Sequence, residues 1–160
     1  FPNVIVIDRP IHLLGGETPM TAILKHDATV ADSDWYLQVH STSPLLRPET
    51  IAAGLAALES SPGHDSLFSV TRLQTRLYDA ESQPVNHDPA VLLRTQDLPP
   101  LYEENSGMYV FSREQIAEGG RLGARPLLFE INPLEATDID EEPDFVLAET
   151  LHRMQREGLL

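Results

Sequence analysis

Strands and helices alternate along the first 71 residues, and this alternation limits the possible folds more than any other feature of the sequence. Runs at residues 3–8 (NVIVID), 35–39 (WYLQV) and 66–71 (SLFSVT) are typical of buried strands. Thr18-Pro19 and Pro48 mark the starts of two intervening helices, because proline suits the first turn of a helix. This β-α-β-α-β order predicts an α/β fold with a mainly parallel sheet flanked by helices.

The second helix should present Ile51, Leu55 and Leu58 on one face and end at Gly63. After the third strand, residues 72–105 contain four prolines, scattered charges and no sustained period. We therefore expect this stretch to be an irregular arm inserted in a single domain that spans residues 1–160.

Regular elements resume after the arm. Residues 107–111 (GMYVF) and 126–131 (PLLFEI) are strand-like. Between them, Ser112 and Gln115 have capping-box spacing for a short helix that Gly119-Gly120 should stop. A last helix should begin at Pro143, and its apolar face is formed by Leu147, Leu151 and Met154.

Charge and composition exclude several classes of protein. The 160 residues include 25 acidic and 11 basic residues, a formal net charge of −14 that opposes binding to nucleic acid or an anionic membrane. Apolar runs fall far short of the ~20 residues that span a bilayer, so we expect a soluble, cytoplasmic protein. Cysteine is absent, and the six histidines lack zinc-site spacing. GxSxG, Walker and GxGxxG motifs are also absent.

The stretch His40-Ser41-Thr42-Ser43-Pro44 follows a predicted strand and precedes a predicted helix. Such junctions face the crevice beyond the carboxyl ends of parallel strands, where ligands bind. One imidazole and three hydroxyls there can hydrogen-bond a polyhydroxylated or anionic ligand. Alternatively, the hydroxyls only satisfy local turn and cap hydrogen bonds.

Residues 137–142 (TDIDEE) form the strongest acidic cluster. In an extended segment, Asp138 and Asp140 project from the same face, and two such carboxylates can hold Mg²⁺ together with substrate phosphates. The alternative is a solvated acidic run that favours the positive end of the following helix. That alternative accounts for Glu141 and Glu142 better than for Asp138, because the effect fades beyond the first turn.

Six short motifs follow one another: Arg9-Pro10 with Thr18, HSTSP at 40–44, LFSV at 67–70, RTQDLP at 94–99, YEENSGMY at 102–109 and DID at 138–140. Together and in this order they resemble the acylneuraminate cytidylyltransferase family, the CMP-sialic acid synthetases and their relatives. The likeness spans essentially all 160 residues. It implies a Rossmann-like nucleotidyltransferase fold in which residues 72–105 are a dimerisation insert, and hence a homodimer.

The resemblance also implies a reaction, in which CTP activates a nine-carbon sugar acid to give the CMP-sugar and pyrophosphate. Under this resemblance Asp138 and Asp140 are the catalytic pair and hold Mg²⁺. The nucleotide would contact Arg9, Thr18, Met20 and Thr21. The sugar acid would contact His40, Thr42, Ser43, Arg94, Gln96, Asn105 and Tyr109.

Two differences from the family pattern lead to further expectations. The family's N-terminal strand and basic glycine-containing loop, which bind the CTP phosphates, have no counterpart here, so we expect these residues alone to be inactive. Pro19 and Met20 occupy a segment that is more serine-rich in the family. Two alternatives remain: a cytidylyltransferase for another acid, such as ketodeoxyoctonate or a phosphonate, and a noncatalytic dimeric homologue that kept the fold.

Overall fold

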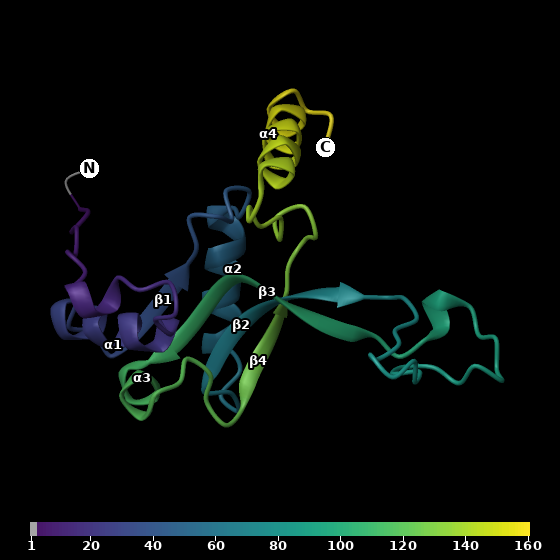
Figure 1. Cartoon of the computed structure of the whole chain (residues 1–160), viewed down its shortest axis with the longest axis horizontal. Helices are drawn as coiled ribbons and strands as arrows, with labels where there is room; N and C mark the ends of the chain where they lie inside the picture. Colours follow the sequence, from purple (N-terminus) through teal and green to yellow (C-terminus); the bar gives the residue numbers. More distant parts are fainter. Residues whose placement is uncertain (1–2) are drawn as a thin grey trace.

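A four-stranded mixed sheet forms the centre of the computed structural model, which describes residues 3–160 (Figure 1). Its strands lie in the order β1 (Trp35–Val39), β3 (Leu101–Ser112), β2 (Ser66–Leu73) and β4 (Pro126–Glu130). Strand β3 runs antiparallel to both neighbours, whereas β2 and β4 are parallel. The predicted α/β class is confirmed, but the sheet is mixed: β1, β2 and β4 share a direction, and only one hydrogen-bonded pair is parallel.

Helices cover both faces of the sheet. Helix α2 (Pro48–Glu59) packs on one face, where Leu67, Met108 and Val110 form a buried cluster. Gly54 permits this contact, since a Cβ there would lie 2.8 Å from the Met108 Cε. Helices α1 (Met20–Val30) and α3 (Arg113–Glu118) cover the other face, over a cluster of Tyr109, Phe111 and Ile116.

The predicted strand at residues 3–8 is wrong, because this segment is irregular and solvent-exposed. The side chains of Val4, Ile5 and Val6 are 63%, 80% and 84% exposed. A strand requires a neighbour that pairs with its backbone N–H and C=O groups, and no strand within residues 3–160 pairs with this segment. An apolar run alone could not reveal this.

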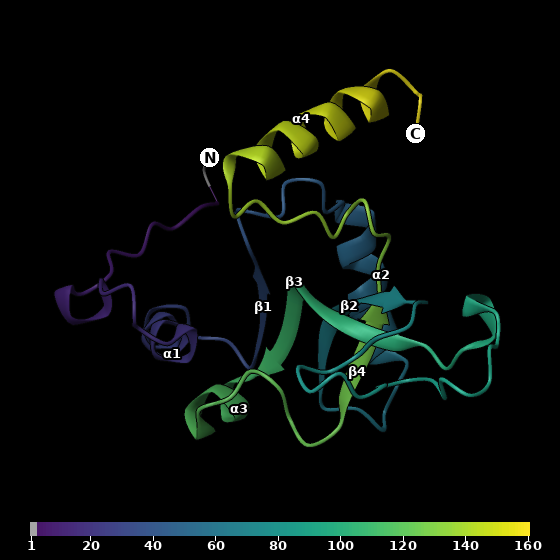
Figure 2. The ribbon, with the colours of Figure 1, turned by 45° about the vertical axis from the view of Figure 1, so that its right-hand side comes forward.

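Two predicted helix features also differ from the structure. Helix α2 ends at Glu59 with Ser60 as its C-cap, so Gly63 lies in the following turn and does not close the helix. Helix α4 (Glu142–Arg156) begins as predicted but projects away from the sheet (Figure 1, Figure 2). Leu147 on its predicted apolar face is 51% exposed, and Ala148 is the buried residue of this helix.

An extended arm connects β2 to β3 (Figure 1). Its base continues the sheet, because Val70 to Leu73 pair with Leu101 to Glu104. Beyond that base the chain is irregular, apart from an isolated bridge between Tyr78 and Pro84 and the 3₁₀ turn η2 (Thr95–Asp97). A second 3₁₀ turn, η1 (Ile11–Leu13), precedes α1.

The short helix α3 has the predicted capping box. The Ser112 hydroxyl accepts a hydrogen bond from the Gln115 N–H, and the Gln115 Oε1 accepts one from the Ser112 N–H at 2.7 Å. Gly119 then ends the helix with φ of 101°, a left-handed conformation that favours glycine. These caps fix the turn that leads from β3 toward β4.

We expect Ser112→Ala to lower the free energy of unfolding by about 1 kcal/mol. The Gln115 N–H at the start of α3 would lose its acceptor, and the reciprocal bond from the Ser112 N–H to the Gln115 side chain would be weakened. Urea unfolding followed by circular dichroism measures this change. Ser33→Ala is a matched control, since Ser33 is exposed and its hydroxyl makes no hydrogen bond within residues 3–160. Equal stability of the two variants would contradict the capping role.

Candidate functional site

One edge of the sheet gathers several of the predicted site residues. Because β1, β2 and β4 point the same way, their carboxyl ends meet at this edge, where ligands bind in open α/β sheets. His40 follows β1, Thr71 lies near the end of β2, and Asp138 follows β4. The antiparallel β3 brings its amino-terminal half, with Asn105, to the same edge.

The acidic motif lies directly beside the serine-threonine junction. The Ile139 N–H donates a hydrogen bond to the Thr42 carbonyl oxygen at 2.9 Å, although 97 positions (139 − 42) separate the two residues. Asp138 and Asp140 line a cleft of about 460 Å³ on this edge. Its other lining residues are Thr71, Glu103, Glu104, Asn105, Ser106, Pro133 and Ala136.

Strand β3 carries an irregularity at the cleft. Between the pairs Phe68–Tyr109 and Val70–Glu104, β3 advances five residues (109 − 104) while β2 advances two (70 − 68). Ser106 adopts φ of 58°, a left-handed conformation that is uncommon outside glycine. Bulges of this kind redirect side chains and are frequent beside functional sites.

Hydrogen bonds from buried polar groups hold this bulge. The Ser69 hydroxyl donates to the Asn105 Oδ1 at 2.6 Å and accepts from the Met108 N–H at 2.9 Å. The Asn105 amide donates to the Thr71 hydroxyl at 2.9 Å, and its Oδ1 also accepts from the Gly107 N–H at 3.2 Å. Asn105, predicted as a substrate contact, therefore also fixes the backbone of β3.

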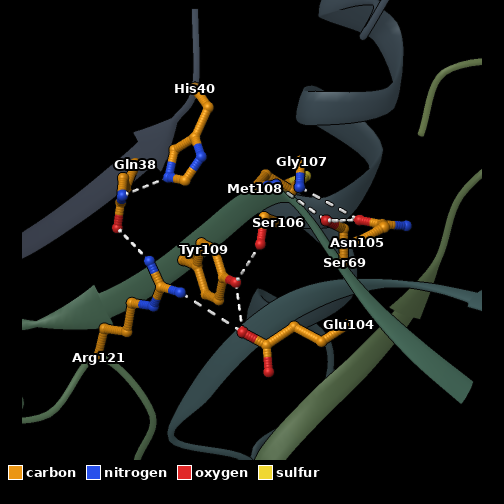
Figure 3. Close-up of polar contacts among 10 residues, drawn as sticks. All are labelled: Gln38, His40, Ser69, Glu104, Asn105, Ser106, Gly107, Met108, Tyr109 and Arg121. Atoms are coloured by element: carbon orange, nitrogen blue, oxygen red, sulfur yellow. Dashed lines mark hydrogen bonds and ion pairs between the residues drawn. The ribbon is translucent and has the colours of Figure 1, made fainter. Parts of the chain in front are cut away.

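A polar network extends from the bulge to the end of β1 (Figure 3). The Tyr109 hydroxyl donates to the Glu104 carboxylate and lies 3.2 Å from the Ser106 hydroxyl. The Arg121 guanidinium stacks on the Tyr109 ring, with its Cζ 3.5 Å from the ring centroid. Gln38 contacts both Arg121, at 3.2 Å, and the His40 ring, at 2.7 Å. The network connects His40 to the acidic cleft.

Tyr109 is held in its neutral form. Burial raises the pKa of the Tyr109 hydroxyl above its ordinary value, and its hydrogen bond to Glu104 acts in the same direction. The neighbouring Ser106 hydroxyl and the Arg121 charge oppose this shift without cancelling it. Tyr109 is thus a hydrogen-bond donor to Glu104 rather than an anion at neutral pH.

An ion pair between the exposed Arg47 and the buried Glu135 fixes the loops that carry the junction and the acidic motif. Glu135, 2% exposed, accepts from the Arg47 backbone N–H at 3.1 Å and from the Arg47 Nε at 2.8 Å. Burial alone would raise the pKa of Glu135, but hydrogen bonds from Thr50 and Arg47, with the Arg47 charge, lower it below its ordinary value. Arg47 is the N-cap residue of α2, and Glu135 lies three positions (138 − 135) before Asp138.

Other predicted contacts are not brought to this edge. Arg94 and Gln96 lie on the arm, where the Arg94 Nε donates to Asp97 at 2.7 Å. The predicted nucleotide contacts occupy the segment before α1 and its first turn, and no hydrogen bond or ion pair within residues 3–160 joins them to the cleft. These four residues are Arg9, Thr18, Met20 and Thr21.

The two alternatives for the acidic run can be compared with the local contacts. A capping box at the start of α4 uses Glu141 and Asp144, so part of the acidic run does serve the helix. Asp138 accepts only its neighbour Ile139 N–H, and the Asp140 carboxylate accepts no hydrogen bond from residues 3–160. In the same range, no group of three or more His, Asp or Glu side chains is arranged to hold a metal ion.

The hydroxyls of the junction make no hydrogen bond with any residue from 3 to 160, and α2 has no side-chain cap. Thr42 and Ser43 contribute to the local structure through their backbones, as the Ser43 N–H donates to the His40 carbonyl oxygen at 3.2 Å. The proposal that the hydroxyls only satisfy turn and cap hydrogen bonds therefore lacks support in these contacts. The exposed Ser41 and the half-buried Thr42 remain available to a ligand, whereas Ser43 is only 7% exposed.

Several residues of the site were not predicted from the sequence. Glu104 belongs to a quoted motif, but nothing in the motif distinguishes it from the neighbouring Glu103. Gln38 precedes His40 by two positions, a spacing that places both side chains on one face of a strand. Arg121 and Glu135 carry no local signal, because their partners Tyr109 and Arg47 are distant in sequence.

Comparison with known proteins places the chain in a family. It belongs to the cytidylyltransferase family, whose model matches residues 4–154. N-acylneuraminate cytidylyltransferase A of Danio rerio is 29% identical over 123 residues, and N-acylneuraminate cytidylyltransferase of Oncorhynchus mykiss is 30% identical over 123 residues. Each match covers 72% of this chain and 28% of the relative. The predicted family resemblance is confirmed.

No helix within residues 3–160 is both long and apolar enough to cross a membrane.

We expect Glu135→Gln to lower the free energy of unfolding at neutral pH by about 1–3 kcal/mol, because a buried network loses its charge. Since the folded-state pKa of Glu135 is lowered, its stabilisation is present above the ordinary carboxyl pKa and lost as pH falls through the folded-state value. The difference between wild type and variant should therefore shrink in acid. Urea unfolding at several pH values measures it.

Glu130→Gln is a matched control for the loss of one negative charge. Glu130 is exposed, and its carboxylate makes no hydrogen bond within residues 3–160. A pH-independent difference for Glu135→Gln would contradict the assigned role of the ionised carboxylate.

Proposed function

We propose that this chain forms the sugar-acid and metal-binding part of a CTP-dependent acylneuraminate cytidylyltransferase with a Rossmann-like nucleotidyltransferase fold. The observation that supports it best is the hydrogen bond between Ile139 and Thr42, which holds the aspartate pair beside the strand-end junction. Family membership supports a cytidylyl transfer, and the two fish relatives support a sialic acid or a related acid as the substrate.

Asp138 and Asp140 fit a magnesium ion as its protein ligands. Both line the same cleft, both offer carboxylate oxygens, and neither takes part in the capping box of α4. Mg²⁺ usually takes one or two carboxylates and completes its shell with water and substrate phosphates, so a pair of aspartates is sufficient. When bound, the ion would neutralise charge on the triphosphate during the transfer.

The remaining residues of the edge would position the sugar acid. Thr42 offers a free hydroxyl, and His40 offers a ring nitrogen beside it. The acid's anomeric hydroxyl would attack the α-phosphate of CTP, and the bond to the β-phosphate would break to release pyrophosphate. Holding both reactants in line accounts for much of the catalysis in such transfers.

We further propose that the arm forms a homodimer. The arm extends away from the sheet (Figure 1). It carries a run of exposed apolar side chains at Val91, Leu92 and Leu93. Arg94 and Gln96 follow this run, so an arm that lies across a second subunit would bring them toward that subunit's site. This arrangement explains how residues distant from the cleft of their own chain can contact the substrate.

We expect Asp140→Asn to reduce turnover roughly a hundredfold or more, because the metal loses a charged ligand. The measurement is pyrophosphate release from CTP with N-acetylneuraminate, legionaminate, pseudaminate and ketodeoxyoctonate, in the protein as its gene encodes it. Glu142→Gln is the matched control, since Glu142 is exposed in the first turn of α4 and does not line the cleft.

Turnover that survives Asp140→Asn would contradict the metal assignment. Acid binding without turnover in the wild-type protein would favour the noncatalytic dimeric homologue.

We expect Leu92→Asp to convert the dimer into a monomer, because a charge would be buried at the arm's apolar contact. Leu92 is 86% exposed in one chain, so the folding of that chain should not change. Sedimentation velocity measures the mass in solution, and Val30→Asp, at an exposed position of α1 away from the arm, is the control. A dimer that persists in Leu92→Asp would contradict this interface.

A further inference from the structure

Arg121 lies between α3 and β4, in a segment outside the six motifs, yet its side chain reaches the centre of the polar network (Figure 3). The side chain is 21% exposed, and its guanidinium covers the ring of the fully buried Tyr109. Stacking of arginine on an aromatic ring holds the guanidinium plane in one orientation. Arg121 is therefore positioned in advance of any ligand.

The contacts of Arg121 leave much of its hydrogen-bonding capacity unused. Its Nη1 donates to the Gln38 Oε1 at 3.2 Å, while its Nη2 lies 3.5 Å from the Glu104 Oε1, which is long for a charge-assisted hydrogen bond. Arginine has five N–H donors, and this guanidinium makes no other hydrogen bond with residues 3–160. The Glu104 Oε1 also accepts a hydrogen bond from the Tyr109 hydroxyl, so Arg121 shares this acceptor with Tyr109.

The neighbouring cleft is acidic. Four of its nine lining residues are carboxylates, namely Glu103, Glu104, Asp138 and Asp140, and none is basic. A carboxylate substrate that enters this edge would meet like charges, which oppose its binding unless a cation faces it. Arg121 supplies a cation that contacts Gln38 and Glu104, and Glu104 itself lines the cleft.

We propose that Arg121 binds the carboxylate of the sugar acid and makes the site select acids over uncharged sugars, an assignment that rests on the proposed function. Its planar guanidinium matches a carboxylate in a bidentate manner. Gln38 and Tyr109 are positioning residues, because they hold the guanidinium rather than the ligand. The aspartate pair in the cleft would hold the metal and the phosphates.

A purely structural role for Arg121, as a cover over Tyr109, predicts a different result from a carboxylate contact. Loss of a cover would weaken the binding of acids and uncharged analogues alike. Loss of a carboxylate contact would weaken acid binding only. Comparison of each acid with its own methyl ester separates the two roles, because the ester keeps the sugar and removes the charge.

The test is equilibrium binding by calorimetry, in the protein as its gene encodes it, of N-acetylneuraminate, legionaminate, pseudaminate and ketodeoxyoctonate and their methyl esters. We expect wild type to bind one of these acids at least tenfold more tightly than its ester. Arg121→Gln should bind that acid and ester about equally, and Arg121→Lys should keep part of the preference. Arg125→Gln, which removes an exposed neighbouring charge, should behave like wild type.

A wild-type preference for the acid that persists in Arg121→Gln would overturn the inference and leave the proposed reaction standing. Equal weakening of acid and ester binding would also overturn it in favour of the structural role. Acid-selective binding through Arg121 in a protein that forms no CMP-sugar would support the inference while contradicting the proposed reaction. A wild-type protein that binds none of the acids would overturn both.

Discussion

The ion pair between the exposed Arg47 and the buried Glu135 is the interaction on which the arrangement of the site depends. It joins the start of α2 to the loop after β4, two segments that the sheet alone does not hold together. Together with the nearby hydrogen bond from Ile139 to Thr42, it connects the loop after β1 to the loop after β4. These two strands form opposite edges of the sheet and are not neighbours. Because Glu135 is buried and its pKa is lowered, the ionised pair is the form that the fold selects.

The antiparallel strand β3 provides the second part of the site. It lies between β1 and β2, so its Tyr109 lies near His40 after β1, while its Glu104, Asn105 and Ser106 line the cleft. Its bulge allows Tyr109 to pair with Gln38 on one side while Glu104 pairs with Val70 on the other. The extra residues of β3 would otherwise leave buried backbone donors unpaired, and Ser69 and Asn105 accept them.

Local features of the fold could be predicted from the sequence because their causes are local. Trp35 to Val39 alternate as a strand, Pro48 starts α2, and Ser112 with Gln115 forms the predicted capping box. The strand at residues 3–8 could not be judged locally, since it depends on a pairing partner, and the insertion of β3 between β1 and β2 depends on long-range pairing. The spacing of Asp138 and Asp140 predicted that they project to one side, and both line the cleft, whereas Arg121 and Glu135 contact partners that are remote in sequence.

The distribution of charge bears on the role proposed for Arg121 in so acidic a chain. A net charge of −14 produces a field that repels anions at long range, and the carboxylates of the cleft add to it. A divalent ion at Asp138 and Asp140 would reverse this field only near itself, because salt screens exposed charges beyond about 8 Å at physiological ionic strength. An acid that binds outside this range therefore requires a cation of its own. Arg121, stacked on Tyr109 and only weakly paired with Glu104, meets that requirement from within the same chain.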